Sequence, residues 1–147
     1  GIRYDPIGRL DKESDGLLIY TNDFRIIEAM LNPENKLERE YVVYVKENAT
    51  PRVKTILERG VETQEGIYPP VKRVTLDEEN RHVINIVLTE GKKHEIRRML
   101  NALLLTITSL KRIRFEFLKL GNIKTGEMRE FTVEQKKKLL DLLSLEI

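Results

Sequence analysis

A loop near the start of the chain holds the first residues whose types could support chemistry. Residues 8–16 carry three acids and two bases directly before the apolar run Leu17-Leu18-Ile19. Catalytic groups often lie in loops that rigid strands hold in place, so Asp11 is a candidate catalytic carboxylate. The spacing alone also allows Asp11 to be a turn residue, or a surface partner of Arg9 or Lys12.

A basic stretch lies farther along the chain. From position 92 to position 114 the only acid is Glu95, while seven residues are cationic: Lys92, Lys93, Arg97, Arg98, Lys111, Arg112 and Arg114. Such a cluster could neutralise several phosphates, as nucleic-acid binding requires. A solvated charged face would have the same composition, and the residue pattern leaves both interpretations open.

Both segments must be positioned by secondary structure, and the residue pattern predicts strands around them. Runs of apolar, β-branched and aromatic residues predict strands at residues 16–21, 41–45, 71–76, 82–89 and 109–118. The strand at 71–76 follows two prolines and is expected at a sheet edge.

Capping residues and periodicity predict the helices. A cap at Asn22 or Asp23 opens a helix at 24–31, Thr50-Pro51 opens one that Gly60 ends, and a Thr132 to Gln135 capping box opens a C-terminal helix. The clearest amphipathic segment follows residues 90–93. Its apolar face holds Ile96, Met99, Leu100, Leu103 and Leu104, and its polar face holds His94, Arg97, Arg98 and Asn101.

The predicted elements alternate irregularly, without the regular βαβ rhythm of a doubly wound fold. We therefore expect an α+β fold in which helices pack on a mixed, largely antiparallel sheet. A length of 147 residues with 40% hydrophobic content fits one globular domain.

Composition narrows the function classes. The 26 Lys and Arg nearly balance the 24 Asp and Glu, so net charge adds little to the case for a polyanionic partner. The absence of Cys excludes disulfides and thiolate metal sites, and two His argue against a metal cage. We find no signal-peptide pattern, and the apolar stretches are far shorter than the roughly 20 residues of a membrane span. We expect a cytoplasmic monomer that does not contact membranes.

Five motifs, in the same order along the chain, resemble those of the RsuA-like pseudouridine synthases. Together they cover residues 8–132, which makes the combination specific. They read GRLD with SDGLLI and TND (residues 8–23), REYVVYV (39–45), EGKKHEIRRM (90–99), LKRIR (110–114) and GEMREFT (126–132).

The resemblance implies that the chain isomerises a uridine of structured RNA, most often ribosomal RNA, to pseudouridine, with no metal or organic cofactor. Asp11 would be the nucleophile, adding either to the ribose C1′ or to the uracil ring. Arg97 would pair with Asp11, and Tyr41 would stack on the target uracil. The base would have to be flipped out of the RNA at a cost of a few kcal/mol. RNA binding would fall to Arg9, Lys92, Lys93, His94, Arg98, Lys111, Arg112 and Arg114.

Some features depart from the family pattern. Glu95 stands where Gln is usual, Met128 where Trp is usual and Phe24 where Gly is usual. The family's Lys-Pro-x-Gly strand and its frequent N-terminal RNA-binding domain are not seen, so the resemblance predicts that residues 1–147 are a catalytic domain truncated at its N-terminal side. Two other functions stay open, namely a non-catalytic RNA-binding module that uses the face from Lys92 to Arg114, and a scaffold subunit.

Overall fold

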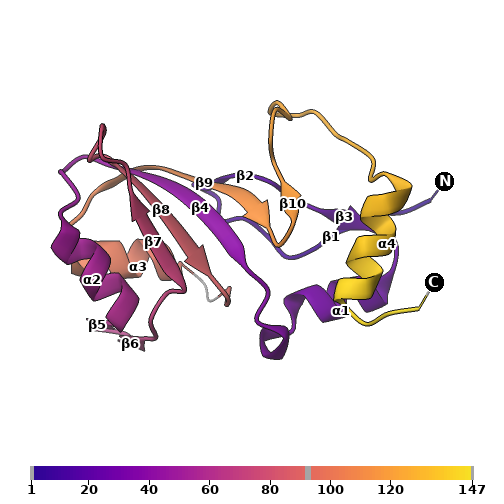
Figure 1. The fold of residues 1–147 in the computed structure, drawn as a ribbon, viewed down its shortest axis with the longest axis horizontal. Coiled ribbons are helices and arrows are strands. Elements are labelled where there is room, and N and C mark those ends of the chain that lie inside the picture. Colours follow the sequence, from indigo (N-terminus) through magenta and orange to yellow (C-terminus); the bar gives the residue numbers. More distant parts are fainter. Residues whose placement is uncertain (1, 92–93, 147) are drawn as a thin grey trace.

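The computed structural model describes residues 2–91 and 94–146. In chain order its elements are β1 (Asp5–Pro6), β2 (Asp15–Gly16), β3 (Tyr20–Thr21), α1 (Phe24–Leu31), a 3-10 turn (Pro33–Asn35), β4 (Arg39–Val45), α2 (Pro51–Arg59), β5 (Val61–Thr63), β6 (Gly66–Tyr68), β7 (Arg73–Leu76), β8 (Val83–Leu88), α3 (Glu95–Ala102), β9 (Ile107–Phe115), β10 (Leu118–Lys119) and α4 (Val133–Leu142). Figure 1 shows α2 and α3 at one end of the molecule and α1 and α4 at the other. Among the described residues, no helix has the length and apolar character needed to cross a membrane.

The main sheet has the strand order β10-β9-β4-β8-β7, and all four of these pairings are antiparallel. Strand β2 adds to β9 in the parallel direction, which makes the sheet mixed. Two small antiparallel pairs, β1 with β3 and β5 with β6, lie apart from it. The predicted α+β class with a mixed, largely antiparallel sheet is confirmed.

The register between strands β4 and β9 shifts at two points, first between Glu40 and Tyr41 and again between Tyr44 and Val45. Tyr41 lies opposite Arg112 and Glu40 lies opposite Arg114, so Ile113 is an extra residue on β9. This is a β-bulge, in which two residues of one strand face one residue of its partner.

The hydrophobic residues form two separate cores. The first packs one face of the sheet, with Val43 and Ile84, against Leu57 of α2 and Met99 of α3. The second gathers Ile7, Met30 of α1, Phe115 of β9 and Leu139 of α4, with Leu37. Since β9 contributes Leu110 to the first core and Phe115 to the second, this strand connects the two.

Local signals set the helix ends as predicted. Asp23 caps α1 by accepting a hydrogen bond from the Arg25 N–H at 2.9 Å. Both bonds of the capping box at α4 are present, between Thr132 and Gln135 at 2.9 and 3.1 Å. Thr50 occupies the N-cap position of α2, but its side chain makes no capping hydrogen bond.

The predicted strand at 16–21 is wrong in extent. The chain pairs with β9 only at Asp15–Gly16 and with β1 only at Tyr20–Thr21. Leu17 and Ile19 between them are buried, because this segment passes from the main sheet into the second core. The apolar run therefore predicted correctly that Leu17 and Ile19 are buried. A buried segment does not have to form a continuous row of hydrogen bonds with neighbouring strands.

The predicted strand at 109–118 is also wrong, because it is a hairpin. Strand β9 ends at Phe115, Glu116 takes a left-handed φ of 51°, and β10 returns with Leu118 opposite Phe115. The turn residues Glu116 and Phe117 include no Gly, Pro or Asn that would have indicated a turn.

Candidate active site

A cleft of about 720 Å³ lies between the loop that carries Asp11, the N-terminal end of α3 and the sheet. Its lining includes six of the residues predicted from the sequence: Arg9, Asp11, Tyr41, His94, Arg97 and Arg112. These residues come from four of the five motifs, which lie far apart in the chain. The fold therefore brings the three predicted catalytic residues to one cavity.

The Asp11 loop is held to β9 through a glycine. Gly16 has a φ of +117°, and a Cβ atom at this position would lie 2.1 Å from the Arg112 carbonyl oxygen. This close approach lets the Leu17 N–H donate to the same oxygen at 2.7 Å. Within the loop, the Ser14 N–H donates to the Asp11 carbonyl at 2.8 Å, which forms the turn that presents Asp11.

Arg112 holds the same loop through its side chain. Its Nε and Nη2 atoms both donate to the Leu17 carbonyl, at 3.0 and 2.7 Å. The residue is only 5% exposed, and its guanidinium lies 5.5 Å from the centre of the Phe115 ring. Arg112 was predicted to bind RNA, and these contacts give it a structural part in the cleft.

Arg39 is a second buried cation in the cleft, and it was not among the predicted site residues. It lies opposite Phe115 on β4, with its guanidinium 4.7 Å from the ring centre, and it donates to the carbonyls of Leu37 and Met30 at 3.0 and 3.3 Å. Burial lowers the pKa of Arg39, and the charge of Arg112 acts in the same direction. Arg39 lies two residues before Tyr41, outside the predicted strand at 41–45 but inside the observed β4, where the alternation of side chains puts both residues on the same face.

Glu95 and Tyr41 also line the cleft, together with these two cations. Glu95 is 3% exposed, and its charge favours the protonated form of Arg39. Tyr41 is half-buried, packs against the first core and lines the cleft, so one side of its ring is supported by apolar neighbours.

Asp11 lies next to His94. The imidazole Nε2 is 3.6 Å from the Asp11 Oδ1, and the two side chains are 42% and 31% exposed. This contact is an ion pair only when His94 is protonated. His94 is the N-cap residue of α3 and has a left-handed φ of 55°. The backbone conformation at the start of the helix therefore sets the direction of the imidazole next to Asp11.

Arg97 contacts the Asp11 loop at a different point. Its Nη2 donates to the Glu13 carbonyl at 3.0 Å, and its Nη1 lies 3.7 Å from the Glu13 carboxylate. The direct pairing of Arg97 with Asp11 that the resemblance implied is not among the contacts of the described residues. The Arg97 Nε is buried and finds no hydrogen-bond partner in that part of the chain.

The other described residues predicted to bind RNA do not line the cleft. Lys111 projects from the opposite face of β9 because it is the neighbour of Arg112, and Arg114 does so because the bulge at Ile113 shifts the alternation by one residue. Arg98 donates to the Tyr68 hydroxyl at 3.3 Å. The five described cations of the basic stretch therefore do not form one face, and Lys92 and Lys93 lie outside the described residues.

Comparisons with known proteins agree on one family. A family model described as RNA pseudouridylate synthase matches residues 2–102. The chain is 34% identical over 140 residues to "Ribosomal large subunit pseudouridine synthase B" of Bacillus subtilis, covering 93% of this chain and 57% of that protein. It is 33% identical to an "Uncharacterized RNA pseudouridine synthase" of Aquifex aeolicus, covering 87% and 52%. The chain thus spans a little over half the length of these curated relatives.

Solved structures support the fold. A "Crystal structure of pseudouridylate synthase" superposes with a TM-score of 0.82 at 23% identity, over 92% of this chain and 59% of the other. The "archaeal box H/ACA sRNP Nop10-Cbf5 complex" matches with a TM-score of 0.55 at 17% identity, over 80% and 40%.

Proposed function

Because this chain belongs to the RNA pseudouridylate synthase family, we propose that it isomerises a uridine of ribosomal RNA to pseudouridine, with Asp11 as the nucleophile. The observation that carries this proposal is the placement of Asp11 in a cleft with Tyr41 and Arg97. The named relatives that act on the large ribosomal subunit support the choice of substrate.

The chemistry needs an ionised carboxylate beside the sugar of a flipped-out uridine. Asp11 adds to the ribose C1′ or to the uracil ring, the N1–C1′ bond breaks, and the base turns. C5 then bonds to C1′, the bond to Asp11 breaks and returns the free carboxylate, the C5 proton is lost, and N1 gains a proton. No atoms are gained or lost overall, so no second substrate is required.

The groups around Asp11 support this role. His94 lies 3.6 Å from its carboxylate, while the Arg97 hydrogen bond to Glu13 and the Arg112 hydrogen bonds to Leu17 hold the two ends of its loop. A fixed loop keeps the nucleophile in a reactive geometry, because an error of about 1 Å can cost about a hundredfold in rate.

Tyr41 and Arg9 act on the nucleotide. The Tyr41 ring, backed by the first core, stacks on the uracil and permits rotation about the stacking direction. Arg9 is exposed at the rim of the cleft and binds the phosphate of the displaced nucleotide. These contacts offset the few kcal/mol that base extrusion costs.

The test compares two carboxylates of the same loop. Asp11→Asn should abolish pseudouridine formation in an rRNA transcript and leave the RNA dissociation constant within about twofold. Asp15→Asn is the matched control, because Asp15 is exposed and its carboxylate accepts a bond from the Gly16 N–H, which an Asn side chain can also accept. Turnover by the Asp11→Asn protein at the control rate would refute the role of Asp11. RNA binding without turnover, by both the normal protein and the Asp15→Asn control, would leave an RNA-binding module as the better assignment.

The substrate is tested in cells that lack the gene. Chemical labelling of pseudouridine across the ribosomal RNA should show the loss of a signal in the large subunit, restored by the normal gene and not by the Asp11→Asn gene. An unchanged rRNA map, with a signal lost from transfer RNA instead, would redirect the proposal to that substrate.

A further inference from the structure

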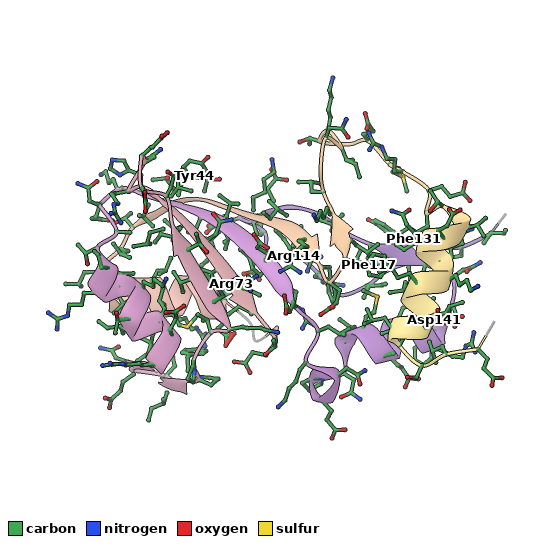
Figure 2. All side chains as sticks on the ribbon, in the orientation of Figure 1. Tyr44, Arg73, Arg114, Phe117, Phe131 and Asp141 are labelled. Carbon is green, nitrogen blue, oxygen red and sulfur yellow. The ribbon has the colours of Figure 1, made fainter. Side chains whose placement is uncertain are left out.

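A second hollow lies on the face of the sheet opposite the cleft. We call it the outer groove; it has a volume of about 670 Å³, and its lining consists of Glu38, Glu40, Arg73, Lys111, Ile113, Arg114, Lys119, Leu120 and Gly121. Figure 2 shows Arg73 and Arg114 on this face, turned toward the viewer. Lys111 and Arg112 are consecutive residues, yet the first lines the outer groove and the second lines the cleft.

Four of the six charged residues of the outer groove lie in one row across the sheet. Successive cross-strand partners on β7, β8, β4, β9 and β10 are Arg73, Val87, Glu40, Arg114 and Lys119. Strands lie about 4.8 Å apart, so the row is roughly 19 Å long. Cations occupy both of its ends.

The two carboxylates of the outer groove are already bound by protein cations. Arg114 donates to Glu40 at 2.8 Å and to Glu38 at 3.0 Å, and Lys72 also pairs with Glu38. Burial opposes ionisation of Glu40, but hydrogen bonds from Arg114 and Asn85 hold its pKa below the usual value. Both acids therefore stay charged at neutral pH, and their charges are balanced by Arg114 and Lys72 of the protein itself.

Three cations of the outer groove are left over. Arg73, Lys111 and Lys119 are exposed and come from three different strands, and none forms an ion pair within the described part of the chain. Four cations against two carboxylates give the lining a net positive charge. Several separate positive charges along one groove fit a ligand with repeated negative charges.

We propose that the outer groove binds the phosphate backbone of a second segment of the same RNA whose target uridine enters the cleft. This inference rests on the proposed function for its choice of RNA. An acidic protein is the less suitable occupant, because the lining offers no aromatic side chain and only Ile113 and Leu120 as partly buried apolar groups, whereas protein interfaces usually have an apolar or aromatic centre. Phosphate contacts would add affinity and orientation rather than sequence readout.

The position of the outer groove dictates which RNA can use it. Strand β9 separates the two sites, so an RNA that fills both must pass around the edge of the sheet. A short stem-loop that carries the target uridine reaches only the cleft. A longer rRNA fragment can reach both faces.

The test is the salt dependence of RNA binding. Arg73→Gln, Lys111→Gln and Lys119→Gln are combined in the full chain, and the control combines Arg52→Gln, Lys54→Gln and Lys137→Gln, which remove the same charge from exposed positions of α2 and α4. Three lost phosphate contacts should reduce the slope of log K against log salt by about 2 for the long RNA, with affinity about tenfold or more below the control at low salt. The short stem-loop should give the same slope for both proteins.

Equal slopes for the two triple variants on the long RNA would overturn the proposal and make an acidic protein the better candidate for this face. A lower slope on both RNAs would also overturn it, since the cations would then act on RNA in general and not on a second segment. The outcome is separable from the proposed function, because binding is measured without turnover. Loss of the catalytic assignment would leave the salt slopes interpretable.

Discussion

Gly16 permits a close approach on which the position of Asp11 depends, and Gly16→Ala tests that dependence. The new Cβ would lie 2.1 Å from the Arg112 carbonyl oxygen, so β2 must move away from β9. Strain at the positive φ costs about 1–3 kcal/mol. Loss of the Leu17 N–H bond costs about 1 kcal/mol and loss of the charge-assisted Arg112 bond about 1.5–3 kcal/mol. We expect the free energy of unfolding to fall by about 4–6 kcal/mol.

Gly66→Ala is the matched control for this change. Gly66 has a similar φ of +129° in the β5–β6 hairpin, but a Cβ there would meet nothing within 4 Å. Its loss should therefore be limited to the strain of about 1–3 kcal/mol. The difference between the two variants, about 3 kcal/mol, measures the contact between the loop and β9.

Urea denaturation of both variants gives the stabilities, and pseudouridine formation gives the effect on the site. At concentrations of protein that remain folded, Gly16→Ala should lower the rate at least about a hundredfold, because the loop that aims Asp11 is displaced. Gly66→Ala should leave the rate unchanged. If the two variants lose the same stability and keep the same rate, the close approach at Gly16 does not hold the site, and the reasoning fails.

Three further predictions concern caps, clamps and pH. Thr132→Ala should destabilise the protein by about 1 kcal/mol while Thr50→Ala changes little, since only Thr132 makes a capping bond; equal losses in thermal unfolding would contradict this. Arg112→Lys should cost about 2–3 kcal/mol in urea unfolding by losing the two-donor bond, and an unchanged midpoint would argue against the clamp. Because the pKa of Glu40 is lowered in the folded state, its ionisation stabilises the protein fully above the ordinary value of about 4.5, and this stabilisation is lost as the pH falls below that value. Glu40→Gln should therefore make the free energy of unfolding fall less steeply with decreasing pH in this range. An equally steep fall in the variant would refute the stabilising role of the Glu40 carboxylate.

The sequence predicted local features well because their causes are local. The caps at Asp23 and Thr132 and the stop at Gly60 depend on residues within one turn of each helix end, and the structure has all three positions as expected. The helix at 95–102 also formed, but Leu104 is 85% exposed because the helix ends at Ala102 and Leu104 takes a left-handed φ of 62°. Leu103, one residue beyond the helix end, still packs against the first core, but the second residue beyond it has left the periodic face.

The site could be predicted only in part, because its contacts are not local. Motif resemblance placed Asp11, Tyr41 and Arg97 in one cleft, but not the partners they have there. The Arg97 bond to Glu13 joins residues 84 positions apart, and the approach of Gly16 to Arg112 depends on how β2 docks. The separation of Lys111 from Arg112 follows from strand alternation and was available from the sequence.

The bulge at Ile113 decides which residues of β9 reach the cleft. Arg112 and Phe115 both line it although they are three positions apart, a spacing that would put them on opposite sides of a regular strand. The extra residue therefore reverses the alternation of side chains along the rest of β9, and the stacking of Arg39 on Phe115 depends on this reversal. A one-residue deletion there would turn the aromatic ring away from both arginines. In this strand, the number of residues between Arg112 and Phe115 is therefore as necessary to the cleft as the identity of their side chains.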